Sequence, residues 1–294
     1  MALHVHRLAG ALGASVTGID LRSVTDDGPL DELRGALAEH LVVAVPDQDL
    51  TLDDLERLTE LLGGRDTTPY VTPLEGRPYV IRVIKEPDDR LNFANAWHSD
   101  LSYRREPPAY TLLHAWEVPD FGGDTLWSNQ YLAYESLSDG LKETLRGLRA
   151  VHSAGMAYGT GGFLDQVKGL TSMAIDPSPE AYAEQAHPVV VAHPVTGRAA
   201  LYVNPVYTTR FEGWSPLESQ ELLGLLYRQA TDENHTCRLR WARHTLAIWD
   251  NRCTMHNALN DYPGQRREMY RTSVRGSPPQ GAASPRWPGS IPPR

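Results

Sequence analysis

The sequence predicts a mainly β fold, a β-sandwich or jelly-roll barrel, with a few flanking helices. Most of the chain after residue 98 consists of short runs that read as strands and are separated by turn residues. Only two stretches in this part have helical spacing, and no βαβ repeat is visible in the sequence. Many short strands between turns are typical of closed or two-layered β structures rather than of parallel α/β sheets.

Two helices in the first hundred residues are expected to flank this β core. Apolar residues at helical spacing predict one helix over residues 30–40. Another is expected over 51–62, because Thr51 stands at an N-cap position, acidic residues follow it and two glycines end the run. Continuous or alternating apolar runs predict strands over residues 14–24, 41–48 and 77–86.

The chain after residue 98 supplies most of the expected strands. They are predicted over residues 109–118, 123–129, 187–197, 198–204, 244–250 and 267–276. One helix is expected over 138–150. The other is expected to begin at Ser215, because Pro216 follows at the first helical position and Glu218 completes a capping box.

These elements are expected to form a single domain over residues 1–276. Within it, residues 153–186 are rich in glycine and other small residues, which predicts a long loop of the kind that covers a site as a lid. Residues 277–294 are dense in proline, glycine and serine, which predicts a disordered tail.

The overall composition is ordinary for a globular protein and argues against some classes of function. Of the 294 residues 41% are hydrophobic, and the formal net charge is −9. This acidic balance disfavours nucleic acid or an anionic membrane as a partner. No run reaches the roughly 18 apolar residues that a membrane span needs, and two cysteines give no disulfide framework. We therefore expect a soluble, cytoplasmic protein.

A histidine and a carboxylate stand two residues apart in the run WHSD, at His98 and Asp100. On a strand such residues point to the same face, so the two side chains can meet one metal ion. His256 is the candidate for a third ligand. Two histidines and one carboxylate form the facial triad of non-haem Fe(II) oxygenases, which leaves coordination positions open. Spacing alone leaves open a solvated turn with His256 as an ordinary loop residue.

Two arginines are expected to share a face of one strand. The run REMYRTS alternates, which places Arg267, Met269 and Arg271 together. Guanidiniums inside a barrel need anions, and a bound dicarboxylate would supply them with charge-assisted bonds of about 1.5–3 kcal/mol each. Thr125 opens another strand, where its hydroxyl can donate to the same carboxylate. The alternatives are an edge strand with solvent-exposed arginines and a threonine chosen for β-propensity alone.

Four runs together resemble the taurine dioxygenase (TauD/TfdA-like) family of Fe(II)/2-oxoglutarate-dependent dioxygenases. They are WHSD, GGDTLWSN, HPVTGRAALYVN and WDNRCTMHNALNDYPGQRREMYR. The resemblance extends from LGASVTGIDL to about Gly276 and implies a double-stranded β-helix, the jelly-roll or cupin-like fold. By position it implies the iron ligands His98, Asp100 and His256.

The same resemblance implies where the co-substrate binds. Thr125 and Arg267 match the pair that holds the distal carboxylate of 2-oxoglutarate. Arg271 matches a second arginine near both the co-substrate and the anionic group of the substrate. The implied reaction uses Fe(II), 2-oxoglutarate and O2, releases succinate and CO2, and oxidises a C–H bond of a small molecule. Because Asp100 is present, hydroxylation is favoured over halogenation.

The sequence departs from the family where taurine would bind. Taurine-specific members use a histidine and a tyrosine before the first core strand and an asparagine ahead of the metal pair. Pro69, Thr72 and Ala94 stand there, and Asn95 lies one residue off. We therefore expect a small, anionic substrate other than taurine, such as an alkyl sulfate, another sulfonate, or an amino-acid-derived or natural-product intermediate. Candidate substrate contacts are Arg271, Asn95, Tyr70, Tyr103 and Phe163.

Other interpretations stay open at this point. One is a zinc-dependent hydrolase on a jelly-roll fold, although it has no need of a dicarboxylate pocket. Another is a taurine or alkylsulfonate dioxygenase for sulfur scavenging. Family members are often dimers or tetramers, so the resemblance leaves a homo-oligomer open. The remaining core histidines, including His193, lack a carboxylate at ligand spacing and are expected to be structural.

Overall fold

A large antiparallel sheet forms the base of the molecule. The computed structural model describes residues 3–25, 27–167 and 169–283. The sheet has eight strands in the order β1-β2-β3-β14-β6-β16-β4, with β5 also paired to β16, and only β2 and β3 run parallel. The strands are β1 (His4–Arg7), β2 (Ala14–Thr17), β3 (Val42–Val45), β4 (Arg65–Asp66), β5 (Ile81–Lys85), β6 (Tyr110–Glu117), β14 (Leu246–Asp250) and β16 (Arg267–Val274).

A second antiparallel sheet shares an apolar core with the first. Its order is β13-β7-β15, from β13 (Thr236–Leu239), β7 (Thr125–Asn129) and β15 (Thr254–Ala258). Trp127 and Cys237 of this sheet lie in one buried cluster with Trp249 and Met269 of the large sheet. Two sheets that enclose one core are the predicted β-sandwich or jelly-roll arrangement.

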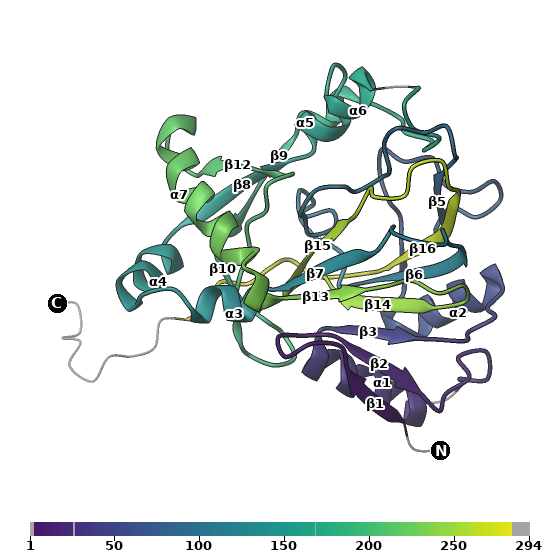
Figure 1. Ribbon diagram of the computed structural model, residues 1–294. Helices are drawn as coiled ribbons and strands as arrows, with labels where there is room; N and C mark the ends of the chain where they lie inside the picture. Colours follow the sequence, from purple (N-terminus) through teal and green to yellow (C-terminus); the bar gives the residue numbers. More distant parts are fainter. Residues whose placement is uncertain (1–2, 26, 168, 284–294) are drawn as a thin grey trace.

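Two helices cover the outer face of the large sheet, as Figure 1 shows. They are α1 (Asp27–His40) and α2 (Leu52–Gly63), and their leucines pack with Val43 and Ile248 in a second buried cluster. Helix α2 starts as predicted: Thr51 accepts from the Asp54 N–H, and the Asp54 carboxylate accepts from the Thr51 N–H. The central strands β3 and β14 are therefore buried on both faces. The inner face of the sheet points away from these helices and can line a site.

The remaining elements gather at the other end of the molecule. Two small sheets consist of β8 (Arg149–Ser153), β9 (Glu184–Pro188) and β12 (Thr208–Phe211), and of β10 (Val190–Ala192) and β11 (Ala199–Leu201). The helices are α3 (Gln130–Glu135), α4 (Asp139–Arg146), α5 (Gly155–Tyr158), α6 (Phe163–Gln166), α7 (Pro216–Ala230), η1 (Pro179–Tyr182) and η2 (Glu233–His235). The capping box predicted before α7 is present.

Two segments differ from expectation. Residues 153–186 hold α5, α6 and η1 rather than one unbroken loop. The expected tail begins at 277, yet Gln280 and Ala282 exchange backbone hydrogen bonds with Ala192 and Val190. The open edge of β10 explains this pairing, because an edge strand presents unpaired N–H and C=O groups. Residues 284–294 of that prediction lie outside the described residues.

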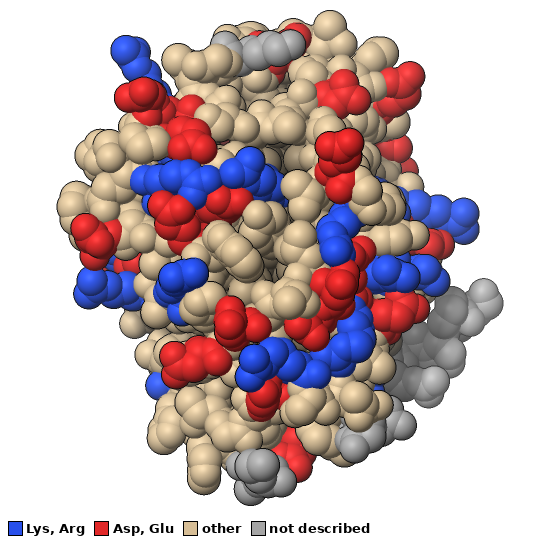
Figure 2. All heavy atoms as spheres, turned by 90° about the vertical axis from the view of Figure 1, so that its right-hand side faces the viewer, with Lys and Arg blue, Asp and Glu red and all other residues tan. Residues whose placement is uncertain are grey.

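The surface agrees with the modest net charge. On the face seen in Figure 2, acidic and basic side chains are interspersed rather than gathered into one patch of a single sign. Within the described residues, none of the helices is both long enough and apolar enough to cross a bilayer.

Candidate active site

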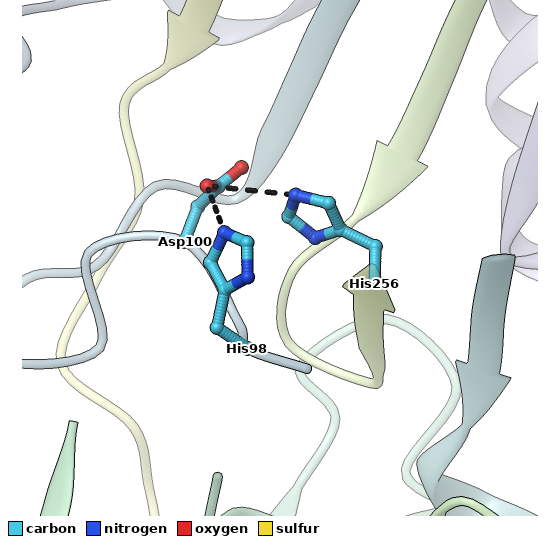
Figure 3. A group of neighbouring side chains, drawn as sticks. All are labelled: His98, Asp100 and His256. Atoms are coloured by element: carbon cyan, nitrogen blue, oxygen red, sulfur yellow. Dashed lines mark ion pairs between the residues drawn. The ribbon is translucent and has the colours of Figure 1, made fainter. Parts of the chain in front are cut away.

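The three candidate metal ligands come together between the two sheets. His98 and His256 exchange backbone hydrogen bonds of 3.0 Å and 2.8 Å, which bring the segment before β6 against β15. The Asp100 Oδ1 atom lies 3.6 Å from Nε2 of His98 and 3.9 Å from Nε2 of His256. Figure 3 shows the two imidazoles turned toward this carboxylate. All three side chains are buried, and their ligand atoms lie within 4.8 Å of one another.

The local structure around Asp100 differs from the strand that the sequence argument assumed. His98 makes only an isolated bridge, and the chain turns at Asp100, with a positive φ of 50° at Leu101. The Ser99 hydroxyl donates to the Thr254 carbonyl at 2.8 Å and holds the turn against β15. The histidine and the carboxylate therefore meet through a turn rather than through the alternation of a strand.

A chain of hydrogen bonds orients the Asp100 carboxylate. The Thr111 hydroxyl donates to Oδ2 at 2.7 Å, and the Asn251 amide donates to that hydroxyl at 2.9 Å. The Trp249 indole in turn donates to the Asn251 side-chain carbonyl at 2.9 Å. Oδ2 is thereby occupied, while Oδ1 faces the histidines. Sequence analysis missed Thr111 and Asn251, since neither carries a local signal: one lies in an ordinary apolar strand and the other in a turn.

The backbone orients one of the two histidines, and burial keeps the other neutral. His98 Nδ1 lies 2.7 Å from the Ala96 carbonyl, which can only accept, so Nδ1 carries the hydrogen and Nε2 is free. An outer hydrogen bond of this kind is typical of metal-binding histidines. Burial, with the neighbouring His98, lowers the pKa of His256 to about 3, so its imidazole is neutral near pH 7.

Asp100 is held as an anion. Burial alone would raise its pKa, but the Arg271 guanidinium and the two imidazoles outweigh burial and keep the pKa well below its usual range. Arg271 Nη2 lies 3.0 Å from Oδ1. Two imidazoles and one carboxylate on one side of a cavity are a donor set that fits Fe(II) and leaves positions free for other ligands.

The arginine face of β16 is as the alternation predicts. Arg267, Met269 and Arg271 are buried toward the interior. Nε and Nη2 of Arg267 have no hydrogen-bond partner, although the side chain is only 4% exposed. Thr125 Oγ1 on β7 accepts from the Trp241 indole at 3.0 Å, which leaves the threonine O–H free to donate. A cavity of about 30 Å³ joins this threonine and both arginines to the three candidate metal ligands.

A larger, mainly apolar cavity of about 180 Å³ lies beside the first and shares Phe93, Ala94 and His98 with it. Tyr158 of α5 and Phe163 of α6 form part of its wall, so the segment predicted as a lid contributes directly to this cavity. Other lining residues are Asn92, Asn95, Leu164, Val206 and Tyr207.

Two of the predicted substrate contacts lie elsewhere. Tyr70 and Tyr103 line a separate surface cavity with Arg104 and Glu180. Their rings pack behind the apolar cavity, at centroid distances of 5.8 Å from Tyr70 to Tyr158 and 4.9 Å from Tyr103 to Tyr207. The sequence alone does not show whether an aromatic side chain lines the cavity or packs behind the residues that line it. Asn95 and Phe163, by contrast, do line the apolar cavity.

A second cluster with ligand-type side chains is occupied by the protein itself. His193 Nε2 lies 3.0 Å from Asp250 Oδ2, a carboxylate that the sequence analysis did not assign to it. The backbone N–H groups of Val195 and Thr196 donate to His193 Nδ1, so Nε2 carries the proton toward Asp250. Both carboxylate oxygens also accept from Arg252. This cluster, which includes Cys253, is therefore a buried ion pair rather than a metal site.

Comparisons with known proteins agree with this geometry. Residues 4–273 match the family described as "Taurine catabolism dioxygenase TauD, TfdA family". An alkylsulfatase of Acinetobacter baylyi is 32% identical over 284 residues, covering 95% of this chain and 87% of the relative. An alpha-ketoglutarate-dependent sulfate ester dioxygenase of Pseudomonas putida is 33% identical over 292 residues, covering 96% and 92%. A solved taurine dioxygenase from Burkholderia xenovorans superposes with a TM-score of 0.78 at 31% identity, covering 95% and 93%.

These matches extend over nearly the whole chain and confirm the jelly-roll fold and the class of reaction. Alpha-ketoglutarate is another name for 2-oxoglutarate, the co-substrate that the family uses with Fe(II) and O2. The chain is an Fe(II)- and 2-oxoglutarate-dependent dioxygenase that acts on a small molecule, and it belongs to the TauD/TfdA family.

Proposed function

We propose that His98, Asp100 and His256 hold Fe(II), and that Arg267 and Thr125 hold the distal carboxylate of 2-oxoglutarate. The observation that carries this proposal is the cavity where the buried triad faces two arginines, each of which has two side-chain nitrogens without a hydrogen-bond partner. When bound, iron and 2-oxoglutarate supply the activation of O2. The protein contributes the positions of the reactants and a site closed to bulk water.

Each residue has a definite task in this scheme. Arg267 offers two N–H groups and Thr125 one O–H group to a single carboxylate. These buried donors would then form charge-assisted hydrogen bonds with the bound carboxylate. Thr111 keeps Asp100 from rotating, so that Oδ1 stays directed at the metal position. Arg271 holds that oxygen from the other side and lies where an anionic substrate or the co-substrate would pass.

We propose further that the substrate is an organic anion with a hydrocarbon chain, and a medium-chain alkyl sulfate is the first compound to test. The cavity beside the metal position is lined mainly by apolar and aromatic side chains, which suits a hydrocarbon chain. The relatives described as an alkylsulfatase and a sulfate ester dioxygenase support this choice. Hydroxylation of the carbon that bears the sulfate would release an aldehyde and hydrogen sulfate, while 2-oxoglutarate and O2 give succinate and CO2.

The test begins without oxygen. Apo protein is mixed with Fe(II) and 2-oxoglutarate, and the visible charge-transfer band of the chelate is recorded. We expect the band in wild type and its loss in His256→Ala. Candidate substrates are then compared by their perturbation of the band and, in air, by stoichiometric formation of aldehyde, sulfate and succinate.

Each result leads to a different conclusion. A band without alkyl sulfate turnover would reject the substrate and keep the co-substrate site, so that natural-product acids would be tested next. The absence of a band in well-folded protein would reject the assignment of the site residues.

A further inference from the structure

A buried lysine lies beside Arg267 and takes no part in the site described so far. Lys85 ends β5, is only 3% exposed, and its Nζ atom has no hydrogen-bond partner. It also makes no ion pair within 4.0 Å in the part of the chain that the structure describes. A buried ammonium group without an acceptor is strongly unfavourable. A buried cation of this kind is typical of a site that binds an anion.

The strand register directs Lys85 toward the co-substrate region. Lys85 and Arg267 stand directly opposite each other in the antiparallel pair of β5 and β16, so their side chains leave the same face. Arg267 points into the cavity with Thr125. Two cations thus project side by side from adjacent strands toward the same interior.

Tyr262 connects the two cations. Lys85 Nζ lies 4.6 Å from the centre of the buried Tyr262 ring. Burial raises the pKa of Tyr262, and the charge of Arg267 opposes that rise, which places the guanidinium close to the phenol. The Tyr262 hydroxyl lies close to Arg267 and Asn92, but it makes no well-aligned hydrogen bond with either. Buried polar groups are nearly always satisfied, so several unsatisfied donors in one place indicate a site for an anion.

The nearby carboxylate does not neutralise this group. Asp124 lies near enough to Arg267 to oppose the lowering of the arginine pKa by burial. Its Oδ2 atom, however, accepts from Arg238 at 2.5 Å, and its Oδ1 atom makes no hydrogen bond, so neither oxygen meets Lys85 or Arg267. Lys85 and Arg267 together therefore leave an excess of positive charge in the interior.

We propose that Lys85 is a positioning residue that supplies the second cation for the distal carboxylate of 2-oxoglutarate. A carboxylate has about four acceptor positions. Arg267 offers two unpartnered donors and Thr125 one, so one position remains for the lysine. Lys85 thereby favours dicarboxylic 2-oxo acids over monocarboxylic ones. This inference rests on the proposed co-substrate site.

The test compares two 2-oxo acids in the full-length protein. Lys85→Met keeps an unbranched apolar stem of similar size, Lys85→Arg keeps the charge, and Lys142→Met on α4 is the matched control. The dissociation constants of 2-oxoglutarate and of 2-oxopentanoate, which lacks the distal carboxylate, are measured anaerobically from the charge-transfer band with Fe(II). We expect Lys85→Met to weaken 2-oxoglutarate about 10-fold to 100-fold and 2-oxopentanoate less than twofold. Lys85→Arg should restore most of the loss.

Two outcomes would overturn the proposal. Unchanged affinity for 2-oxoglutarate in Lys85→Met would show that the lysine does not meet the carboxylate. An equal loss for both oxo acids would show a purely structural role, exerted through Tyr262. A wild-type protein that gives no band would instead reject the co-substrate site itself, so the two failures are distinguishable.

Discussion

Two consecutive arginines at the start of β16 have opposite surroundings: Arg266 directly precedes the strand, and Arg267 is its first residue. On the outer side, Arg266 pairs with Glu86 at 3.1 Å and also contacts Glu117 and Glu268. On the inner side, its neighbour Arg267 is more deeply buried and has two nitrogens without partners. Outside, the protein neutralises its own cations, which stabilises the fold. Inside, Arg267 has no anionic partner in the protein. This is expected to lower the stability of the fold until the proposed co-substrate binds.

The largest expected effect comes from the proposed metal ligands next to the inner face. His256→Ala removes one of three protein donors, so turnover in the presence of Fe(II) should fall more than about 100-fold, beyond the loss typical of outer-shell changes. His6→Ala, on the exposed strand β1, is the control. Oxygen consumption and succinate formation provide the measurement, and near wild-type rates would contradict the ligand assignment.

Arg267→Ala tests the comparison directly. The dissociation constant of 2-oxoglutarate should rise at least about 10-fold, since a bidentate charge-assisted contact is lost. The free energy of unfolding without ligand should stay the same or increase, because a buried unpaired charge is removed. Titration of the charge-transfer band and urea unfolding measure the two quantities.

The matched variant for that test is Arg266→Ala on the outer face. It should leave 2-oxoglutarate binding unchanged and reduce stability. If Arg266→Ala and Arg267→Ala behaved alike in both measurements, the proposed division between the two faces of β16 would be wrong.

A smaller effect is expected from the support of Asp100. Thr111→Val keeps the shape of the side chain but removes the donor to Oδ2, so the carboxylate is free to rotate. Metal affinity should fall about 10-fold to 100-fold. Calorimetric titration with Mn(II) measures it without turnover, and Thr144→Val on exposed α4 is the control. Unchanged affinity would leave Thr111 with a packing role only.

The smallest effect concerns the outer face alone. Burial would raise the pKa of Glu268, but hydrogen bonds from Arg82, Tyr270 and Arg266 outweigh it and hold the pKa at about 2. A lowered folded-state pKa adds stability above the unfolded value of about 4.3, and this contribution is lost as the pH falls toward 2. Glu268→Gln should therefore cost about 2 kcal/mol near pH 7 and about half of that at pH 3. Urea unfolding at the two pH values measures this loss in the free energy of unfolding, and Glu212→Gln is the control. An equal loss at both pH values would show that the charge of Glu268 is irrelevant.

Local patterns were sufficient for much of this molecule. The alternation of REMYRTS predicted which side of β16 each arginine occupies, because successive side chains of a strand alternate whatever the strand pairs with. The Thr51 N-cap of α2 and the capping box before α7 were predicted because both involve residues only three apart. The types of metal ligand, too, were readable from the side chains themselves.

Pairings between distant segments required the tertiary structure. Thr111 reaches Asp100 only because the turn at Asp100 packs against β6, and Lys85 stands opposite Arg267 only through the register of β5 and β16. The turn at Asp100 is held by a contact with Thr254, far along the chain. Whether an aromatic side chain lines a cavity, as Phe163 does, or supports its wall, as Tyr103 does, depends on what packs against it. The sequence by itself determined the chemistry of the donors and the face of each strand, because these depend on residue type and local geometry. Only the fold decided which donors meet, because register and packing are set by contacts between residues far apart in the chain.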